Sequence, residues 1–248
     1  MSLKYQIDEQ VPGEVAVEES TPVQGLRSPI PVYTSILIAG VIAVFVTQMA
    51  TGMDASIRSA GFDKQAFIVN HEYWRILTGA ATHASLLHVG MNCYAFYSFG
   101  KIFEMLTNRA HLAIAFLLSA LGGGVLSLVF APGIPSVGAS GGIVGLIGYL
   151  VIYAFRRRQF ISPEFRKNLL INIGFILVFG LALYNVIGNF GHVGGLLTGV
   201  IYGLIQIPSD PHVDPREANS VTEIAGIAAL GLYLATCAFS ILLILRII

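Results

Sequence analysis

Ser140 and His192 are the residues of this sequence whose side chains could together form a nucleophile and its base. Ser140 lies in the sequence Gly-Ala-Ser-Gly and His192 in Gly-His-Val-Gly-Gly, and each stands near the start of a long apolar segment. A serine hydroxyl is a weak nucleophile until a base takes its proton, and histidine is the most common such base. The pair therefore indicates acyl-transfer chemistry, provided that the two segments bring the side chains together.

The composition places most of this chain in lipid. Hydrophobic residues make up 55% of the 248 residues and charged residues only 11%, against about 25% charged residues in soluble domains. The mean hydropathy is +0.74. The 14 basic and 14 acidic residues cancel, which argues against a nucleic-acid partner because such partners usually require a basic surplus.

Seven segments are long and apolar enough, or nearly so, to cross a bilayer, which takes about 17–25 residues. They cover residues 31–51, 85–106, 110–131, 137–155, 168–184, 190–207 and 223–246. The sequence therefore predicts an all-α membrane protein. The loop at 52–84 is rich in aromatic residues and is expected to lie in the headgroup region. Residues 1–29 are acidic and lack an apolar core, so we expect a disordered tail.

Basic residues set the expected orientation. The link between the fourth and fifth segments is the most basic part of the sequence, with Arg156, Arg157, Arg158, Arg166 and Lys167. The positive-inside rule then places the N-terminus in the cytoplasm and the C-terminus outside. The acidic tail resembles neither a signal peptide nor an Arg-rich transit peptide. We therefore expect a multi-pass protein of a bacterial plasma (inner) membrane.

This orientation gathers four polar side chains near the outer face. The second, fourth and sixth segments all start there, and their first turns carry His88, Asn92, Ser140 and His192. Polar side chains are expensive in a membrane, so such a cluster indicates a functional site. Glycines line one face of the fourth segment and one of the sixth, which would let these helices pack closely. These are Gly141, Gly145 and Gly148, and Gly195, Gly199 and Gly203.

An acidic third member is missing from this cluster. No Asp or Glu lies between Glu104 and Glu164, or between Glu164 and Asp210. Glu104 itself lies near the inner end of the second segment, a membrane thickness away from the outer cluster. The sequence therefore predicts a Ser-His dyad rather than a Ser-His-Asp triad.

His88 and Asn92 are four residues apart and share one helix face. Their N–H groups are suitable donors to a tetrahedral oxyanion, and equally suited to hydrogen bonds that hold helices together. The spacing of His83, His88 and His192 fits no zinc motif and no carboxylate or thiolate joins them, so we expect no metal site. A transporter lined by the same residues would require charged mid-membrane residues and internal repeats, and neither is evident.

Several motifs that occur in order resemble the rhomboid family of intramembrane serine proteases over about residues 70–205. The motifs are Trp74-Arg75, His83, His88-x-x-x-Asn92, Glu104, Gly138-x-Ser140-Gly141, and Gly191-His192 followed by Gly195 and Gly199.

The resemblance implies that Ser140 is the nucleophile and His192 the general base. It also implies an oxyanion hole formed by Asn92, His88 and the backbone N–H of Ser140. Many bacterial members carry a tyrosine that stacks on the histidine, at the position where this sequence has Val144.

The family further implies a six-helix core, here residues 30–207, followed by a linker and an extra transmembrane helix at 208–248. Such a core would cleave membrane-anchored substrates near the outer surface, with no cofactor. The expected partners are protein substrates with a transmembrane helix and the lipid bilayer, and the sequence sets no oligomeric state. The alternative is a non-proteolytic rhomboid-like binder or chaperone of membrane proteins. Inactive relatives usually lack the serine or the histidine, and both are present here.

Overall fold

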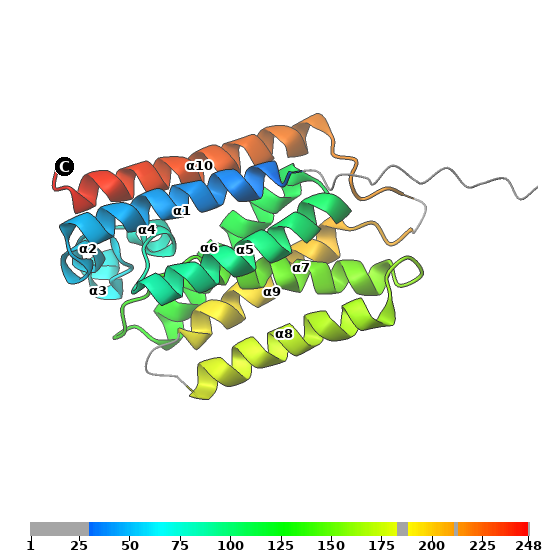
Figure 1. The fold of residues 1–248 in the computed structure, drawn as a ribbon, viewed down its shortest axis with the longest axis horizontal. Helices are drawn as coiled ribbons and strands as arrows, with labels where there is room; N and C mark the ends of the chain where they lie inside the picture. The colour runs from blue at the N-terminus through cyan, green and yellow to red at the C-terminus, as the bar shows by residue number, and fades with distance from the viewer. Residues whose placement is uncertain (1–29, 183–187, 211–212, 248) are drawn as a thin grey trace, which may run out of the picture.

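The regular elements of the described chain are helices. The computed structural model describes residues 30–182, 188–210 and 213–247, so the tail expected at 1–29 lies outside the described residues. Ten helices run through the described part (Figure 1). They are α1 (Val32–Thr51), α2 (Met53–Ala60), α3 (Lys64–Val69), α4 (Arg75–Ala81), α5 (Leu86–Leu106), α6 (Arg109–Phe130), α7 (Ser140–Arg156), α8 (Pro163–Ala182), α9 (Asn189–Gln206) and α10 (Ser220–Ile244).

Each apolar segment predicted from the sequence coincides with one of the long helices. The clearest difference is α8, which begins at Pro163 rather than at residue 168. The hydroxyl of Ser162 caps this end by accepting the N–H of Phe165 at 3.2 Å, and proline suits the first helical position. The first turn of α8 contains the charged residues Glu164, Arg166 and Lys167, so the apolar part of the helix begins only at residue 168.

Three helices of the described chain are long and apolar enough to cross a membrane. They are α1, α6 and α10, with 20, 22 and 25 residues. The helix α7 is apolar but shorter, with 17 residues. Because α10 packs against both α1 and α6, the three form one apolar layer of an integral membrane protein. In Figure 1, α1 and α10 lie side by side along one edge and α8 lies along the opposite edge.

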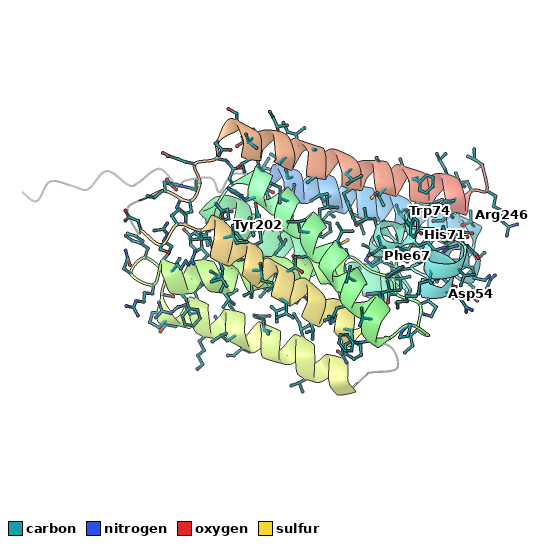
Figure 2. The ribbon with its side chains drawn as sticks, turned by 180° about the vertical axis from the view of Figure 1, so that it is seen from behind. Asp54, Phe67, His71, Trp74, Tyr202 and Arg246 are labelled. Atoms are coloured by element: carbon teal, nitrogen blue, oxygen red, sulfur yellow. The ribbon has the colours of Figure 1, made fainter. Side chains whose placement is uncertain are left out.

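The loop at 52–84 is folded into three short helices, α2, α3 and α4. Arg75 holds this loop together from inside, because its buried guanidinium donates to the carbonyls of Arg58 and Gly61 at 3.1 and 2.9 Å and pairs with Glu72. Trp74 instead faces outward and packs edge-on against Phe239 of α10, with ring centroids 5.9 Å apart. Figure 2 shows Trp74 at the same end of the molecule as Arg246, which follows α10.

The C-terminal helix α10 is tied to this loop by a buried hydrogen bond. The hydroxyl of Tyr233 donates to the carbonyl of Ala80 in α4 at 3.0 Å, and Tyr233 is fully buried. Two turns nearer the start of α10, a Cβ added at Gly226 would lie 2.4 Å from Cα of Ala110 in α6. The helix therefore packs along its length against the rest of the molecule.

Glu104 of α5 caps the first turn of α1. Its Oε1 accepts both the backbone N–H and the hydroxyl of Thr34, each at 2.7 Å. The two helices meet closely there, because a Cβ at Gly100 would lie 2.5 Å from the Thr34 hydroxyl. A carboxylate is well placed at a helix N-terminus, where it satisfies free N–H groups and the helix dipole.

We expect Glu104→Ala to lower the free energy of unfolding in detergent by about 1–3 kcal/mol, because two hydrogen bonds to a charged acceptor are lost. The measurement is the thermal unfolding midpoint of the purified protein. Glu164→Ala removes an exposed carboxylate from the first turn of α8 and serves as the control, with a smaller expected loss of about 0.3–1 kcal/mol, because only the interaction with the helix dipole is removed. Equal midpoints for Glu104→Ala and the wild type would contradict the capping role.

Candidate active site

Ser140 and His192 are in direct contact. The Nε2 atom of His192 lies 2.9 Å from the hydroxyl oxygen of Ser140, although the residues are far apart in sequence. Ser140 is the first residue of α7 and His192 lies in the first turn of α9. This is the distance at which an imidazole can take a hydroxyl proton.

Glycines on α7 and α9 allow this contact. A Cβ added at Gly195 would lie 2.0 Å from the carbonyl oxygen of Gly141, and one added at Gly199 would lie 1.9 Å from that of Gly145. The backbones of the two helices therefore touch with no side chain between them. Only glycine allows two helices to approach this closely. The close approach brings the first turn of α9 next to the first turn of α7.

The start of α7 leaves backbone N–H groups free beside Ser140. Ala139 occupies the N-cap position and gives no side-chain cap. The first helical hydrogen bond runs from Ile143 N–H to the Ala139 carbonyl at 3.1 Å. The N–H groups of Ser140, Gly141 and Gly142 therefore have no partner within the helix. Together with the positive end of the helix dipole, they suit a developing oxyanion.

Gly138 is required two residues before the serine. Its φ of +115° is a conformation that residues with a side chain rarely adopt. In addition, a Cβ at Gly138 would lie 2.9 Å from Nε2 of His88 and 2.8 Å from Cε1 of the same ring. The imidazole of His88 therefore lies directly against the backbone that leads into Ser140.

His88 places an N–H group against this backbone, and Asn92 lies one turn further along α5. Nδ1 of His88 is an acceptor for the Ala84 N–H at 3.4 Å, so its proton belongs on Nε2, the atom that faces Gly138. Asn92 is buried and donates one amide N–H to the His88 carbonyl at 2.9 Å. The second N–H of that amide is left for another acceptor.

The second ring nitrogen of His192 has no partner among the described residues. With Nε2 accepting the serine proton, Nδ1 carries the hydrogen of the neutral ring. Val144, where we noted a departure from the rhomboid pattern, is buried one turn beyond Ser140. The ring contacts within the described chain do not include His192.

His83, which lies between α4 and α5, contacts the residue directly before Ser140. It is fully buried, and its Nε2 accepts the Ala139 N–H at 3.4 Å. Gln48 of α1 holds its backbone in turn, with Oε1 accepting the His83 N–H at 2.9 Å and Nε2 donating to the His83 carbonyl at 3.1 Å. Sequence reasoning missed Gln48, although a glutamine inside an apolar segment is a signal for a buried polar contact.

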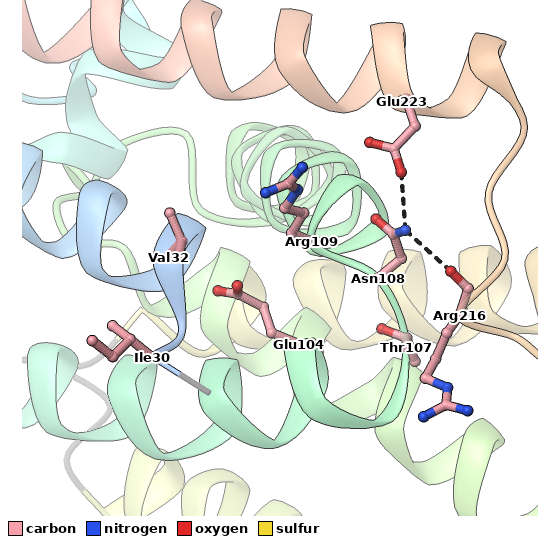
Figure 3. A pocket seen from close by; sticks show the side chains of 8 residues that line it. All are labelled: Ile30, Val32, Glu104, Thr107, Asn108, Arg109, Arg216 and Glu223. Atoms are coloured by element: carbon pink, nitrogen blue, oxygen red, sulfur yellow. Dashed lines mark hydrogen bonds between the residues drawn. The ribbon is translucent and has the colours of Figure 1, made fainter. Parts of the chain in front are cut away.

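The other predicted motif residues lie outside the immediate site. Trp74 and Arg75 organise the loop, and Glu104 lies at the opposite end of α5 from His88. A cavity of about 450 Å³ is found at that opposite end (Figure 3). It is lined by Ile30, Val32, Glu104, Thr107, Asn108, Arg109, Arg216 and Glu223. No group of three or more His, Cys, Asp or Glu side chains that could hold a metal lies within the described ranges.

Burial makes His83 sensitive to acid. Burial lowers the pKa of His83 from 6.5 to about 3, the neighbouring His88 adds to this, and the backbone of Ala81 opposes it. As the pH falls below 6.5, His83 binds a proton in the unfolded chain, whereas in the folded protein it stays neutral until about pH 3. The contribution of His83 to the free energy of unfolding is therefore fully present above pH 6.5 and is lost as the pH falls from 6.5 towards 3.

We expect the wild type to lose about 2 kcal/mol of stability between pH 7.5 and pH 5 through His83. His83→Gln keeps an acceptor but does not titrate, so its unfolding midpoint should fall less over that pH range. His71→Asn changes an exposed histidine and should keep the wild-type slope. The same slope in His83→Gln and the wild type would contradict this account of His83.

Comparison with known proteins identifies the family. A model described as the Rhomboid domain matches residues 70–209. Rhomboid protease GluP of Bacillus subtilis (strain 168) is 31% identical over 172 residues, which cover 68% of this chain and 34% of the relative. RHOMBOID-like protein 6, mitochondrial, of Arabidopsis thaliana is 32% identical over 147 residues, 58% of this chain and 47% of the relative.

Another relative from Arabidopsis thaliana is named Inactive RHOMBOID-like protein 8. It is 26% identical over 138 residues, covering 56% of this chain and 39% of the relative. The chain thus spans less than half the length of these relatives. The Rhomboid model covers more than half of this chain and includes both Ser140 and His192. The chain belongs to the rhomboid family.

Proposed function

We propose that the chain is an intramembrane serine endopeptidase that cleaves proteins anchored by a transmembrane helix, near the outer face of the membrane. The observation that carries this proposal is the 2.9 Å contact between the His192 imidazole and the Ser140 hydroxyl. Family membership and the name of the relative Rhomboid protease GluP support it.

The proposed reaction begins with transfer of the Ser140 hydroxyl proton to Nε2 of His192. The serine oxygen then attacks the substrate carbonyl carbon, and the carbonyl oxygen becomes an oxyanion. The Ser140 N–H, the Nε2–H of His88 and the free amide N–H of Asn92 are the proposed donors to it. His192 returns its proton to the leaving amine, and a water molecule, activated by the same imidazole, releases the acyl group.

The substrate must present an unwound segment. A hydrogen-bonded helix hides its carbonyl groups, and a membrane gives the freed groups no solvent partner. The polar groups in the first turns of α5, α7 and α9 would offer hydrogen-bond partners to the freed backbone groups of the substrate. We therefore propose that cleavage occurs where a substrate helix leaves the hydrocarbon.

We also propose a topology of seven spanning helices, with a six-helix core at 30–207 and an additional helix within 208–248. The seven long helices and the clustering of His88, Ser140 and His192 at one end support it. Basic residues concentrate between α7 and α8, at the other end. By the positive-inside rule the N-terminus is cytoplasmic and the C-terminus is outside, in a bacterial plasma membrane.

We expect the purified protein to react with a fluorophosphonate probe at Ser140, because an activated serine is the nucleophile for such probes. Ser140→Ala and His192→Ala should both abolish labelling. Ser98→Ala changes a partly exposed serine of α5 whose hydroxyl donates to the Tyr94 carbonyl of the same helix, and it should label like the wild type. Labelling that persists in Ser140→Ala would show that Ser140 is not the nucleophile.

We expect the protein in liposomes to release a tag from a single-span substrate. Ser140→Ala should lower the cleavage rate by at least about 1,000-fold, as loss of a nucleophile does elsewhere. Release is measured by gel shift, with mass spectrometry of the cut site. Binding of the substrate without any cleavage by the wild type would favour the alternative function, a non-proteolytic rhomboid-like binder. The name of the inactive Arabidopsis relative makes that alternative worth testing.

A further inference from the structure

Lys64 is a buried lysine in the outer loop, at the start of α3. Only 1% of its surface is exposed. Its Nζ donates to the hydroxyl of Ser136 at 2.6 Å and to the carbonyl of Ile134. Both acceptors belong to the segment at 131–139, which joins α6 to α7 and ends directly before Ser140.

The two oxygen acceptors of Lys64 are neutral. The adjacent Asp63 uses its Oδ1 to cap α3, where it accepts the N–H groups of Gln65 and Ala66 at 2.9 and 3.0 Å. Burial lowers the pKa of Lys64 to about 8, and the charge of Asp63 opposes this. At neutral pH the side chain is therefore an ammonium group, which offers three donors and no acceptor. The Phe62 ring lies beneath it, with 5.4 Å from Nζ to the centroid.

Besides Lys64, the first half of the segment at 131–139 is held by a turn, in which the N–H of Ile134 donates to the Ala131 carbonyl at 3.3 Å. Ile134 has an exposed side chain, 57% accessible, so packing of that side chain does not fix its position. Its carbonyl is fixed by the lysine instead. Ser136 then exchanges two backbone hydrogen bonds with Phe62, each 3.0 Å long, and its hydroxyl lies 2.9 Å from that of Ser127 in α6.

The second half of the segment is held by the same loop. The N–H of Gly138 donates to the Gly79 carbonyl at 2.9 Å, and the N–H of Ala139 donates to His83. A Cβ at Gly79 would lie 2.5 Å from Cβ of Phe62, so the loop is tightly packed where it receives the segment. Hydrogen bonds with the loop thus recur along the segment as far as Ala139, the residue directly before Ser140.

We propose that Lys64 is a positioning residue for Ser140: its ammonium group fixes residues 134–136, and through them the start of α7. This proposal rests on the proposed function, because it concerns the geometry of the same nucleophile. Lys64 acts at a distance and does not touch the reacting atoms. Its loss should therefore slow the reaction of Ser140 and leave substrate affinity nearly unchanged.

The test compares Lys64→Met, which keeps the length of the side chain but has no donor, with Lys64→Arg, which keeps donors. Lys101→Met, at a partly exposed lysine of α5, is the matched control. The readouts are the rate of fluorophosphonate labelling, and kcat and KM for a tagged single-span substrate. Each protein is assayed well below its own unfolding midpoint, so that a loss of folded protein does not enter the rates.

We expect Lys64→Met to lower the labelling rate and kcat by about tenfold to a hundredfold, the range that a small misplacement of a reacting group costs. KM should stay within about twofold, because binding is not altered. Lys64→Arg should recover most of the rate, and Lys101→Met should match the wild type. Ser136→Ala removes one of the two acceptors and should give a smaller loss than Lys64→Met.

Hydrogen–deuterium exchange gives a readout that does not depend on activity. Lys64→Met should increase exchange in the peptide that covers residues 134–140, whereas Lys64→Arg should not. Wild-type labelling and kcat in Lys64→Met, or unchanged exchange at 134–140, would overturn the positioning role. A wild type that neither labels nor cleaves would refute the proposed function instead, and the exchange result would still decide whether Lys64 fixes the segment.

Discussion

The contact between α7 and α9 fixes the geometry on which the rest of the site depends. Ser140 and His192 begin two different helices, and only the separation of those helices decides whether the side chains meet. Gly141 and Gly145 face Gly195 and Gly199 with almost no space between the backbones. Any side chain there would force the helices apart and would separate the imidazole from the hydroxyl. The chemistry of a polar pair thus depends on residues that have no side chain.

The loop at 52–84 directs the chain into α7. This loop is held by buried polar groups rather than by a large apolar core. Arg75 donates to two carbonyls within the loop, and Gln48 of α1 forms hydrogen bonds with both backbone groups of His83. Buried polar groups of this kind are costly unless every partner is present, so they specify one arrangement rather than a range of similar ones. Such an arrangement suits a segment whose last residue precedes Ser140.

The long helices could be predicted from the sequence because lipid selects for uninterrupted apolar runs. The second, fourth and sixth apolar segments start on the same side of a membrane, which predicted that His88, Ser140 and His192 lie at the same end of the molecule. The glycine spacing indicated which helix faces would meet. The short helices α2, α3 and α4 could not be predicted, because each is too brief for a periodic pattern. Lys64 was not singled out either, because its partners at 134 and 136 lie about 70 residues away and only the folded loop brings them together. The catalytic roles of Ser140 and His192 stay predictions.

If the proposed function holds, the glycine contact between α7 and α9 also restricts the route by which a substrate helix would approach from the lipid. A passage between two helices opens when side chains rotate aside, but the surfaces of α7 and α9 that meet are backbone, which cannot rotate independently of its helix. Opening this seam would require moving a whole helix and would break the Ser140–His192 contact in the same step. A lateral path must therefore run past other neighbours of the site. On one side lies α8, which contacts α7 and α9 and exposes Ile171, Phe175 and Val178. The glycine contact that brings Ser140 and His192 together thus closes one side of the molecule to the proposed substrate.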